Sequence, residues 1–325
     1  MPILISRYMA PPGLGNPHCN TFWPVLFRHT PPFSLDLQRI RIETSDADFL
    51  DVDIHPCATA SPRGIAVLSH GLEGNSRRKY ILGLAHMLSA HGFIVMAWNM
   101  RSCSGEMNRT PYLYHMGETG DLATVIAHAA SMGLPVFLAG FSMGGNQICR
   151  YLAREKVSPL VKAAAAISVP CDLAGSAPII DKALGGFYTR YFLRSMRHKV
   201  REKAARFAGY PSLEGLERMS TFAEFDERFT APIYGFASAQ DYWQRNSTSE
   251  DLFAVRVPLY FLQSADDPFC SAACYPVEAA RKNENLHLEI TPHGGHVGFV
   301  QTGPLYYTEQ RVLEFLREVW PGFGV

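Results

Sequence analysis

Short apolar runs alternate with segments of helical periodicity along most of this chain. Apolar runs of four to eight residues bounded by turn residues predict strands, and apolar residues recurring every three or four positions predict helices. Two early runs alternate apolar and polar residues on either side of Thr44-Ser-Asp-Ala-Asp48, which predicts an antiparallel hairpin. The predicted strands are Leu37–Ile42, Phe49–Ile54, Gly64–Ser69, Phe93–Trp98, Ala163–Val169, Leu259–Gln263 and Leu286–Ile290. The predicted helices are Lys79–Ala90, Gly120–Ser131 and Tyr307–Val319.

The order of these elements predicts the domain organisation. Alternating strands and helices indicate a mostly parallel sheet covered on both faces, here formed by residues 36–169 and 252–325. Residues 170–251, called the inserted segment below, interrupt the alternation, are more charged and predict a helical cap. Residues 1–35 are rich in proline and aromatic residues and predict an arm packed on the core, with at most a short helix near Thr21–Arg28.

Composition narrows the class of protein. Hydrophobic residues make up 47% of the 325 and charged residues 18%, which is typical of a globular chain. The formal net charge of zero argues against electrostatic binding of nucleic acid or an anionic membrane. No apolar run approaches the roughly 18 residues that span a bilayer, and the N-terminal pattern does not predict a signal peptide. An odd set of seven scattered cysteines predicts free thiols and a cytoplasmic location.

One stretch carries the strongest chemical signal. An apolar run at Val136–Ala139 is followed by Gly140-Phe-Ser142-Met-Gly144 and then by a helix-like segment, Asn146–Arg154. A strand, a sharp turn with one serine and a helix make up the nucleophile elbow, whose pattern is Gly-x-Ser-x-Gly. The glycines are required because a Cβ beside the serine would collide with the neighbouring strand or helix. We therefore predict Ser142 as a nucleophile.

A serine hydroxyl needs a base, and the base needs an orienting acid. In a fold with this elbow the acid follows a later strand and the histidine comes after it. Asp266 and Asp267 follow the strand at Leu259–Gln263, and His293 and His296 follow the last strand. We favour Asp267 because it directly precedes a proline, with Asp266 as the alternative. We favour His296 over His293 because two glycines before it allow a tight loop.

The tetrahedral oxyanion needs at least two preorganised donors. One is predicted to be the backbone N–H of Met143, and the other that of Leu72, in the loop after Ser69-His70-Gly71. His70 is interpreted as a residue that braces this loop.

Two further features have simpler interpretations. Cys270 and Cys274 would face one side of a helix, but no matching partners accompany them, so neither a metal nor an organic cofactor is predicted. A helix predicted at Tyr188–Ala208 carries a run of basic residues between positions 190 and 203, which we interpret as a solvated face, with contact to a lipid surface as the alternative. These residues are Arg190, Arg194, Arg197, Lys199, Arg201 and Lys203.

Taken together, the motifs resemble the YheT/ABHD family of α/β-hydrolases over almost the whole chain. The matching segments are Asn16-Pro-His-Cys-Asn-Thr21, His70-Gly-Leu-Glu-Gly74, Asn99-Met-Arg-Ser-Cys-Ser-Gly105, Tyr114-His-Met-Gly117 with Asp121, Gly140–Gly145, Phe225–Pro232, Asp241-Tyr-Trp243, Ala265–Pro268 and His293–His296. The resemblance implies that Ser142, Asp267 and His296 form a catalytic triad. The chain departs from the family at Ser102, where glycine is usual, and at Cys19-Asn20, which replace Leu-Gln.

The resemblance implies a serine esterase acting on a small-molecule ester, such as an acylglycerol, a phospholipid or a medium-chain acyl ester. Two alternatives remain: an acyltransferase that uses the same triad, and a non-catalytic ligand-binding module.

Overall fold

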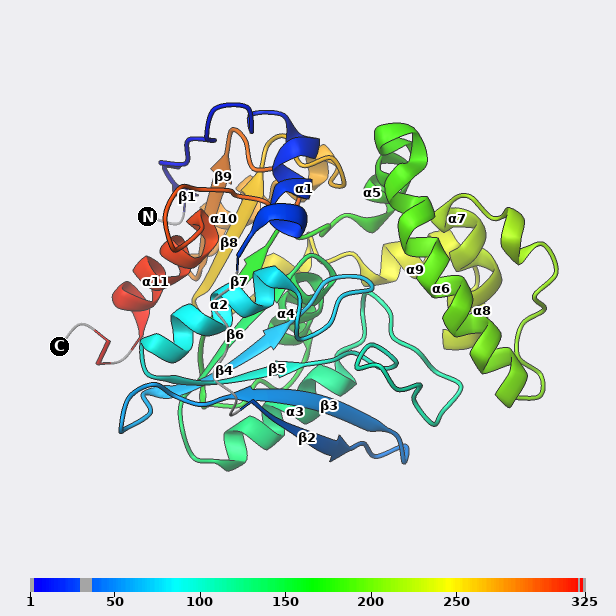
Figure 1. The fold of residues 1–325 in the computed structure, drawn as a ribbon, viewed down its shortest axis with the longest axis horizontal. Coiled ribbons are helices and arrows are strands. Elements are labelled where there is room, and N and C mark those ends of the chain that lie inside the picture. Colours follow the sequence, from blue (N-terminus) through cyan, green and yellow to red (C-terminus); the bar gives the residue numbers. More distant parts are fainter. Residues whose placement is uncertain (1–2, 30–36, 321, 324–325) are drawn as a thin grey trace.

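Within the described residues, nine strands form a single sheet through the core of the protein (Figure 1). The structure, a computed structural model, describes residues 3–29, 37–320 and 322–323. The strand order is β1-β9-β8-β7-β6-β4-β5-β3-β2, and neighbours are parallel except in the pairs β2–β3 and β3–β5. The strands are β1 Ile3–Leu4, β2 Gln38–Glu43, β3 Phe49–His55, β4 Gly64–Ser69, β5 Phe93–Trp98, β6 Val136–Phe141, β7 Val161–Ile167, β8 Leu259–Ser264 and β9 Leu286–Thr291.

Helices cover both faces of the sheet, as predicted. Helices α2 (Lys79–Ala90) and α11 (Tyr307–Val319) pack on one face, and α3 (Gly120–Ser131), α4 (Met143–Arg154) and α10 (Val277–Lys282) pack on the other. The α/β-hydrolase fold class is therefore confirmed. Helix α10 was not predicted, because it has only six residues and too few turns to show a helical period.

The central strands contribute to two hydrophobic cores. In β4, Ile65 and Val67 belong to the core beneath α3 and α4, whereas Ala66 and Leu68 belong to the core beneath α2 and α11. Successive side chains of a strand point to opposite faces, so a strand covered on both faces needs apolar residues at every position. This explains why the central strands appear in the sequence as uninterrupted apolar runs.

The N-terminal residues hold two elements that the sequence analysis missed or shortened. Helix α1 spans Pro17–Phe27 and is longer than the short helix predicted near Thr21–Arg28. Its start is set by Asn16, whose side chain accepts hydrogen bonds from the amides of His18 and Cys19, and by a proline in the first turn. Strand β1 pairs with β9 through only two residues, too few for a recognisable pattern. Residues 30–36 of the predicted arm lie outside the described residues.

The inserted segment leaves the sheet after β7 and returns to it at β8. Its helices gather to one side of the sheet, at the right of Figure 1. They are α5 Leu173–Lys182, η1 Ala183–Gly186, α6 Phe187–Arg206, η2 Leu216–Arg218, α7 Phe222–Phe225, the π-helical turn η3 Asp226–Thr230, α8 Ala231–Tyr234 and α9 Ala239–Asn246. Two short 3-10 turns, η4 Asp251–Ala254 and η5 Ala272–Cys274, flank β8. Leu193, Val200, Phe225 and Phe229 form a small hydrophobic core of this segment.

Among the helices of the described ranges, none is long and apolar enough to cross a membrane.

Candidate active site

Ser142 lies at the turn between β6 and α4, where the predicted elbow falls. Its φ of 52° is in the left-handed region, a strained conformation for a residue with a side chain. The Ser142 amide donates to the carbonyl oxygen of Ile167 at 2.8 Å, which ties the turn to the end of β7. Because α4 begins at Met143, the serine lies at the positive end of a helix.

The flanking glycines permit close backbone contacts at this turn. A Cβ at Gly140 would lie 2.4 Å from the carbonyl oxygen of Gly144. A Cβ at Gly144 would lie 2.6 Å from the carbonyl oxygens of both Ser69 and His70. Only glycine fits at either position without a shift of the backbone, as the sequence pattern required.

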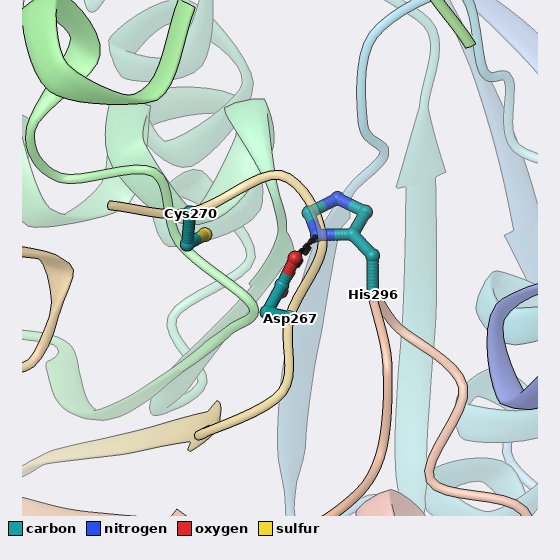
Figure 2. Close-up of side chains that lie close together, drawn as sticks. All are labelled: Asp267, Cys270 and His296. Carbon is teal, nitrogen blue, oxygen red and sulfur yellow. Dashed lines mark hydrogen bonds and ion pairs between the residues drawn. The ribbon is translucent and has the colours of Figure 1, made fainter. Parts of the chain in front are cut away.

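His296 and Asp267 are hydrogen-bonded to each other in the loops after β9 and β8 (Figure 2). The Nδ1 atom of His296 lies 2.8 Å from Oδ2 and 3.1 Å from Oδ1 of the carboxylate. Phe269 fixes this arrangement, since its amide donates to Asp267 Oδ1 at 2.9 Å and its ring lies 4.1 Å from the imidazole centroid. A carboxylate at Nδ1 holds the proton there and leaves Nε2 free to accept one.

The neighbouring pair, Asp266 and His293, is arranged differently. His293 is exposed, and its Nδ1 lies 3.2 Å from Asp266 Oδ2. Asp266 also accepts the amide of Gly295 at 2.9 Å and the hydroxyl of Ser264. These contacts hold the loop that carries His296, and neither residue lines the cavity described below.

The loop after β4 presents a free backbone donor among the described residues. The amide of Gly71 donates to the Tyr80 hydroxyl, and that of Glu73 donates to the Tyr114 hydroxyl, each at 3.0 Å. Within the described part of the chain, the intervening amide of Leu72 has no hydrogen-bond acceptor. The amide of Met143 is the first of α4 and has no partner within the helix. Among the described residues, therefore, neither of the two predicted oxyanion donors has a hydrogen-bond acceptor.

His70 orients the peptide that carries the Leu72 amide. Its Nε2 accepts the Met100 amide at 3.1 Å, so Nδ1 carries the proton and donates to the carbonyl oxygen of Gly71 at 2.7 Å. That carbonyl and the Leu72 N–H belong to one trans peptide and point in opposite directions. Burial lowers the pKa of His70 to about 4, so the ring is neutral near pH 7. This geometry agrees with its interpretation as a bracing residue.

These groups meet at one large cavity of about 590 Å³. Ser142, His296, Leu72 and Met143 all line it. Most of the remaining wall is apolar and comes from α1, the loop before α3, the inserted segment and the loop after β8. It includes Phe22, Leu113, Phe187, Tyr188, Phe192, Met196, Val200, Phe222, Phe225, Phe229, Ile233 and Phe269.

Asp267, Cys270 and His296 each place a potential metal ligand within 4.8 Å of the others. In Figure 2 the carboxylate lies between the thiol and the imidazole and is bonded to the imidazole. Hydrogen bonding with Cys274 and burial raise the pKa of Cys270, so the thiol stays protonated, whereas metals bind the thiolate. The donor set therefore fits an acid–base pair better than a metal site. Cys270 precedes the turn that holds Cys274, so the two do not share a helix.

The basic run on α6 is not a uniformly solvated face, because Lys199 is 6% exposed and Lys203 is fully buried. Both lysines contact loops of the core that are distant in sequence, so the helical pattern alone did not reveal that they are buried.

Ser102 has a φ of 61°, in the left-handed region that favours glycine, which accounts for glycine as the usual residue there.

This sheet, the turn at Ser142 and the hydrogen-bonded pair of His296 and Asp267 are together typical of the α/β-hydrolase class of proteins. The model of the alpha/beta hydrolase family matches residues 66–305, more than half of the chain. The chain therefore belongs to this family.

Individual proteins that this chain resembles agree with the family match. YheT, a candidate esterase of Escherichia coli (strain K12), is 32% identical over 96% of this chain and 93% of its own. The human phospholipase ABHD3 is 32% identical over 80% of this chain, which spans 66% of that protein. Monoacylglycerol lipase of Saccharomyces cerevisiae is 27% identical over 75% of this chain and 57% of its own. The esterase Pf2001 of Pyrococcus furiosus has the same fold, with a TM-score of 0.60 at 16% identity over 96% of this chain and 98% of its own.

Proposed function

We propose that the protein is a serine hydrolase of carboxylic esters with Ser142, His296 and Asp267 as its catalytic triad. The observation that carries this proposal is the shared cavity. A strained serine at a helix N-terminus, a histidine bonded to a buried carboxylate and an unpartnered Leu72 amide all belong to it. The esterase and lipase names of the relatives support the same reaction class.

In the proposed reaction, Ser142 Oγ attacks the ester carbonyl carbon while His296 Nε2 accepts the hydroxyl proton. Asp267 stabilises the imidazolium, and the Leu72 and Met143 amides donate to the oxyanion. The tetrahedral intermediate collapses as His296 protonates the leaving alcohol. Water then attacks the acyl-enzyme, gives a proton to His296 and releases the carboxylic acid and the free serine. These steps use no metal or organic cofactor.

The cavity wall supports an ester with an apolar acyl chain. Aromatic and aliphatic side chains dominate its lining, and four of them, Val25, Leu26, Phe187 and Tyr191, are also exposed to solvent. An apolar lining that continues to the surface suits a lipid-like substrate, and it offers a place for peripheral contact with a lipid surface. A cytoplasmic location remains a prediction, supported by seven free cysteines.

The proposal is tested with p-nitrophenyl esters from acetate to palmitate, with Ser142→Ala as the control. We expect turnover that depends on Ser142, with an optimum above acetate because a longer chain fills the apolar cavity. Unchanged turnover in Ser142→Ala, with the variant folded, would contradict the mechanism.

Adding an alcohol to the same assay separates hydrolysis from acyl transfer. A hydrolase releases mainly the carboxylic acid. A product that is mainly the new ester would instead support the acyltransferase alternative.

A further inference from the structure

Lys199 is a buried cation in the wall of a largely apolar cavity. It lies on α6 of the inserted segment, and its ammonium donates to Glu73 Oε1 at 2.8 Å. The same ammonium lies 3.1 Å from Cys103 Sγ and 5.0 Å from the centre of the Tyr114 ring. The side chains of Lys199 and Glu73 are only 8% and 5% exposed, so little solvent screens the pair.

Glu73 directly follows Leu72 in the loop that presents the free amide. Its φ of 52° lies in the left-handed region, which a glutamate does not adopt without other contacts to hold it. Three such contacts are present: its amide donates to the Tyr114 hydroxyl, its carbonyl oxygen accepts from Arg78, and its carboxylate pairs with Lys199. Tyr114 also donates its hydroxyl to the carboxylate.

The electrostatics agree with a permanent ion pair. Burial by itself would raise the pKa of Glu73. The charge of Lys199, together with hydrogen bonds from Lys199, Ser195 and Tyr114, outweighs burial and leaves the pKa below the ordinary value. Burial would lower the pKa of Lys199, yet its neighbours Cys103 and Glu73 raise it. Both groups are therefore charged near pH 7. Removing either partner leaves the other as an uncompensated buried charge.

We propose that Lys199 is a positioning residue for the oxyanion hole: by holding the Glu73 carboxylate, it keeps the Leu72 amide directed at the substrate oxyanion. The inserted segment then contributes to catalysis as well as to the acyl cavity. Helix α6 must pack against the loop after β4 for Lys199 to hold Glu73. This inference rests on the proposed ester hydrolysis.

Lys203 provides a matched control. It lies one turn further along α6, is fully buried, and donates to the carbonyl oxygens of Asn108, at 2.8 Å, and Thr110. It does not line the cavity. Replacing either lysine by methionine removes a buried cation from the same helix. Only Lys199→Met removes a contact with the loop after β4 that carries Leu72 and Glu73.

The experiment measures kcat and KM on p-nitrophenyl butyrate for the wild type, Lys199→Met, Lys199→Arg and Lys203→Met. Thermal unfolding of each variant reports its folded fraction, to which kcat is normalised. We expect Lys199→Met to lower kcat by about 10- to 100-fold with KM little changed, because the lost donor geometry acts on the oxyanion. Lys199→Arg should recover most of the loss, and Lys203→Met should keep the wild-type kcat.

A double-mutant cycle tests whether Lys199 acts through Glu73. Glu73→Gln should also lower kcat, and the double variant Glu73→Gln with Lys199→Met should be no worse than the poorer single variant. Wild-type kcat in Lys199→Met, an equal loss in Lys203→Met, or additive losses in the cycle would each overturn the inference. Those results leave ester hydrolysis standing, whereas a wild type without Ser142-dependent turnover would overturn both proposals.

Discussion

Asp266 and Asp267 are adjacent in the sequence, yet their carboxylates contact different parts of the site. Asp267 bonds to the buried imidazole of His296, and Asp266 holds the exposed His293 and the amide of Gly295. Position before a proline favoured Asp267, and two preceding glycines favoured His296. The geometry agrees with both choices, although the catalytic roles themselves remain predictions.

Asparagine at each position separates the two roles. Asp267→Asn should lower kcat by about 10³–10⁴-fold, because an amide no longer stabilises the imidazolium or the required tautomer. Asp266→Asn should cost much less, since it weakens only loop contacts. Steady-state kinetics on the best p-nitrophenyl ester measure both, and a larger loss in Asp266→Asn would reverse the assignment.

Residues that support the site without carrying chemistry were harder to find in the sequence. Glu73 and Tyr114 fall within recognised motifs, but nothing in those motifs connects them with Lys199, which follows 126 and 85 positions later. Thr21, whose hydroxyl accepts the His296 amide at 2.9 Å, was likewise missed. Such contacts depend on how distant elements pack, and local patterns carry no information about that packing.

At the level of elements, the sheet and its covering helices were predictable because burial leaves a pattern in the sequence. Burial on one face leaves a period, and burial of a strand on both faces leaves an uninterrupted apolar run. The limits of β4, α2, β5, α3 and α11 match the prediction. Those of β7 and α6 differ by about two residues, which is the usual uncertainty of element ends. Outside the inserted segment, the strand and the α-helix that were missed, β1 and α10, have two and six residues. An element that short has no period to detect.

The elbow makes an element-scale prediction through Gly144. A Cβ there would lie 2.6 Å from the carbonyl oxygens of Ser69 and His70, so Gly144→Ala must push α4 away from the end of β4. We expect a loss of about 1–3 kcal/mol in the free energy of unfolding and a large loss of kcat, because Ser142 moves with α4.

Gly15→Ala is the matched control, because no described residue other than its two chain neighbours has an atom within 4 Å of its Cβ position. Urea unfolding and steady-state kinetics compare the two variants. Equal behaviour would show that the close contact at Gly144 does not position the nucleophile.

At the scale of the whole molecule, three buried histidines predict how stability depends on pH. Burial lowers the pKa of His55 and His70 to about 4, and that of His115 to about 3. Their ordinary pKa is about 6.5, so below that pH the unfolded chain binds protons that the folded protein excludes. Stability should be greatest above pH 6.5 and fall as the pH drops toward 4. Asp226, whose pKa burial raises to about 6, opposes this trend in part.

The contribution of His70 can be isolated with His70→Asn. Between pH 7.5 and 5 the histidine should account for about 2 kcal/mol of the loss in free energy of unfolding, and the variant should lack that part. Urea unfolding at each pH measures the difference. Parallel curves for the variant and the wild type would show that His70 is not held neutral in the fold.

The central claim is that Ser142 is an activated nucleophile. Its most direct test is labelling with a fluorophosphonate, which reacts with serines activated by a neighbouring base, followed by mass spectrometry of the digested protein. We predict one adduct, on the peptide that contains Ser142, absent from Ser142→Ala and formed much more slowly in Asp267→Asn. Labelling of a different serine, or none in the folded wild type, would contradict the assignment.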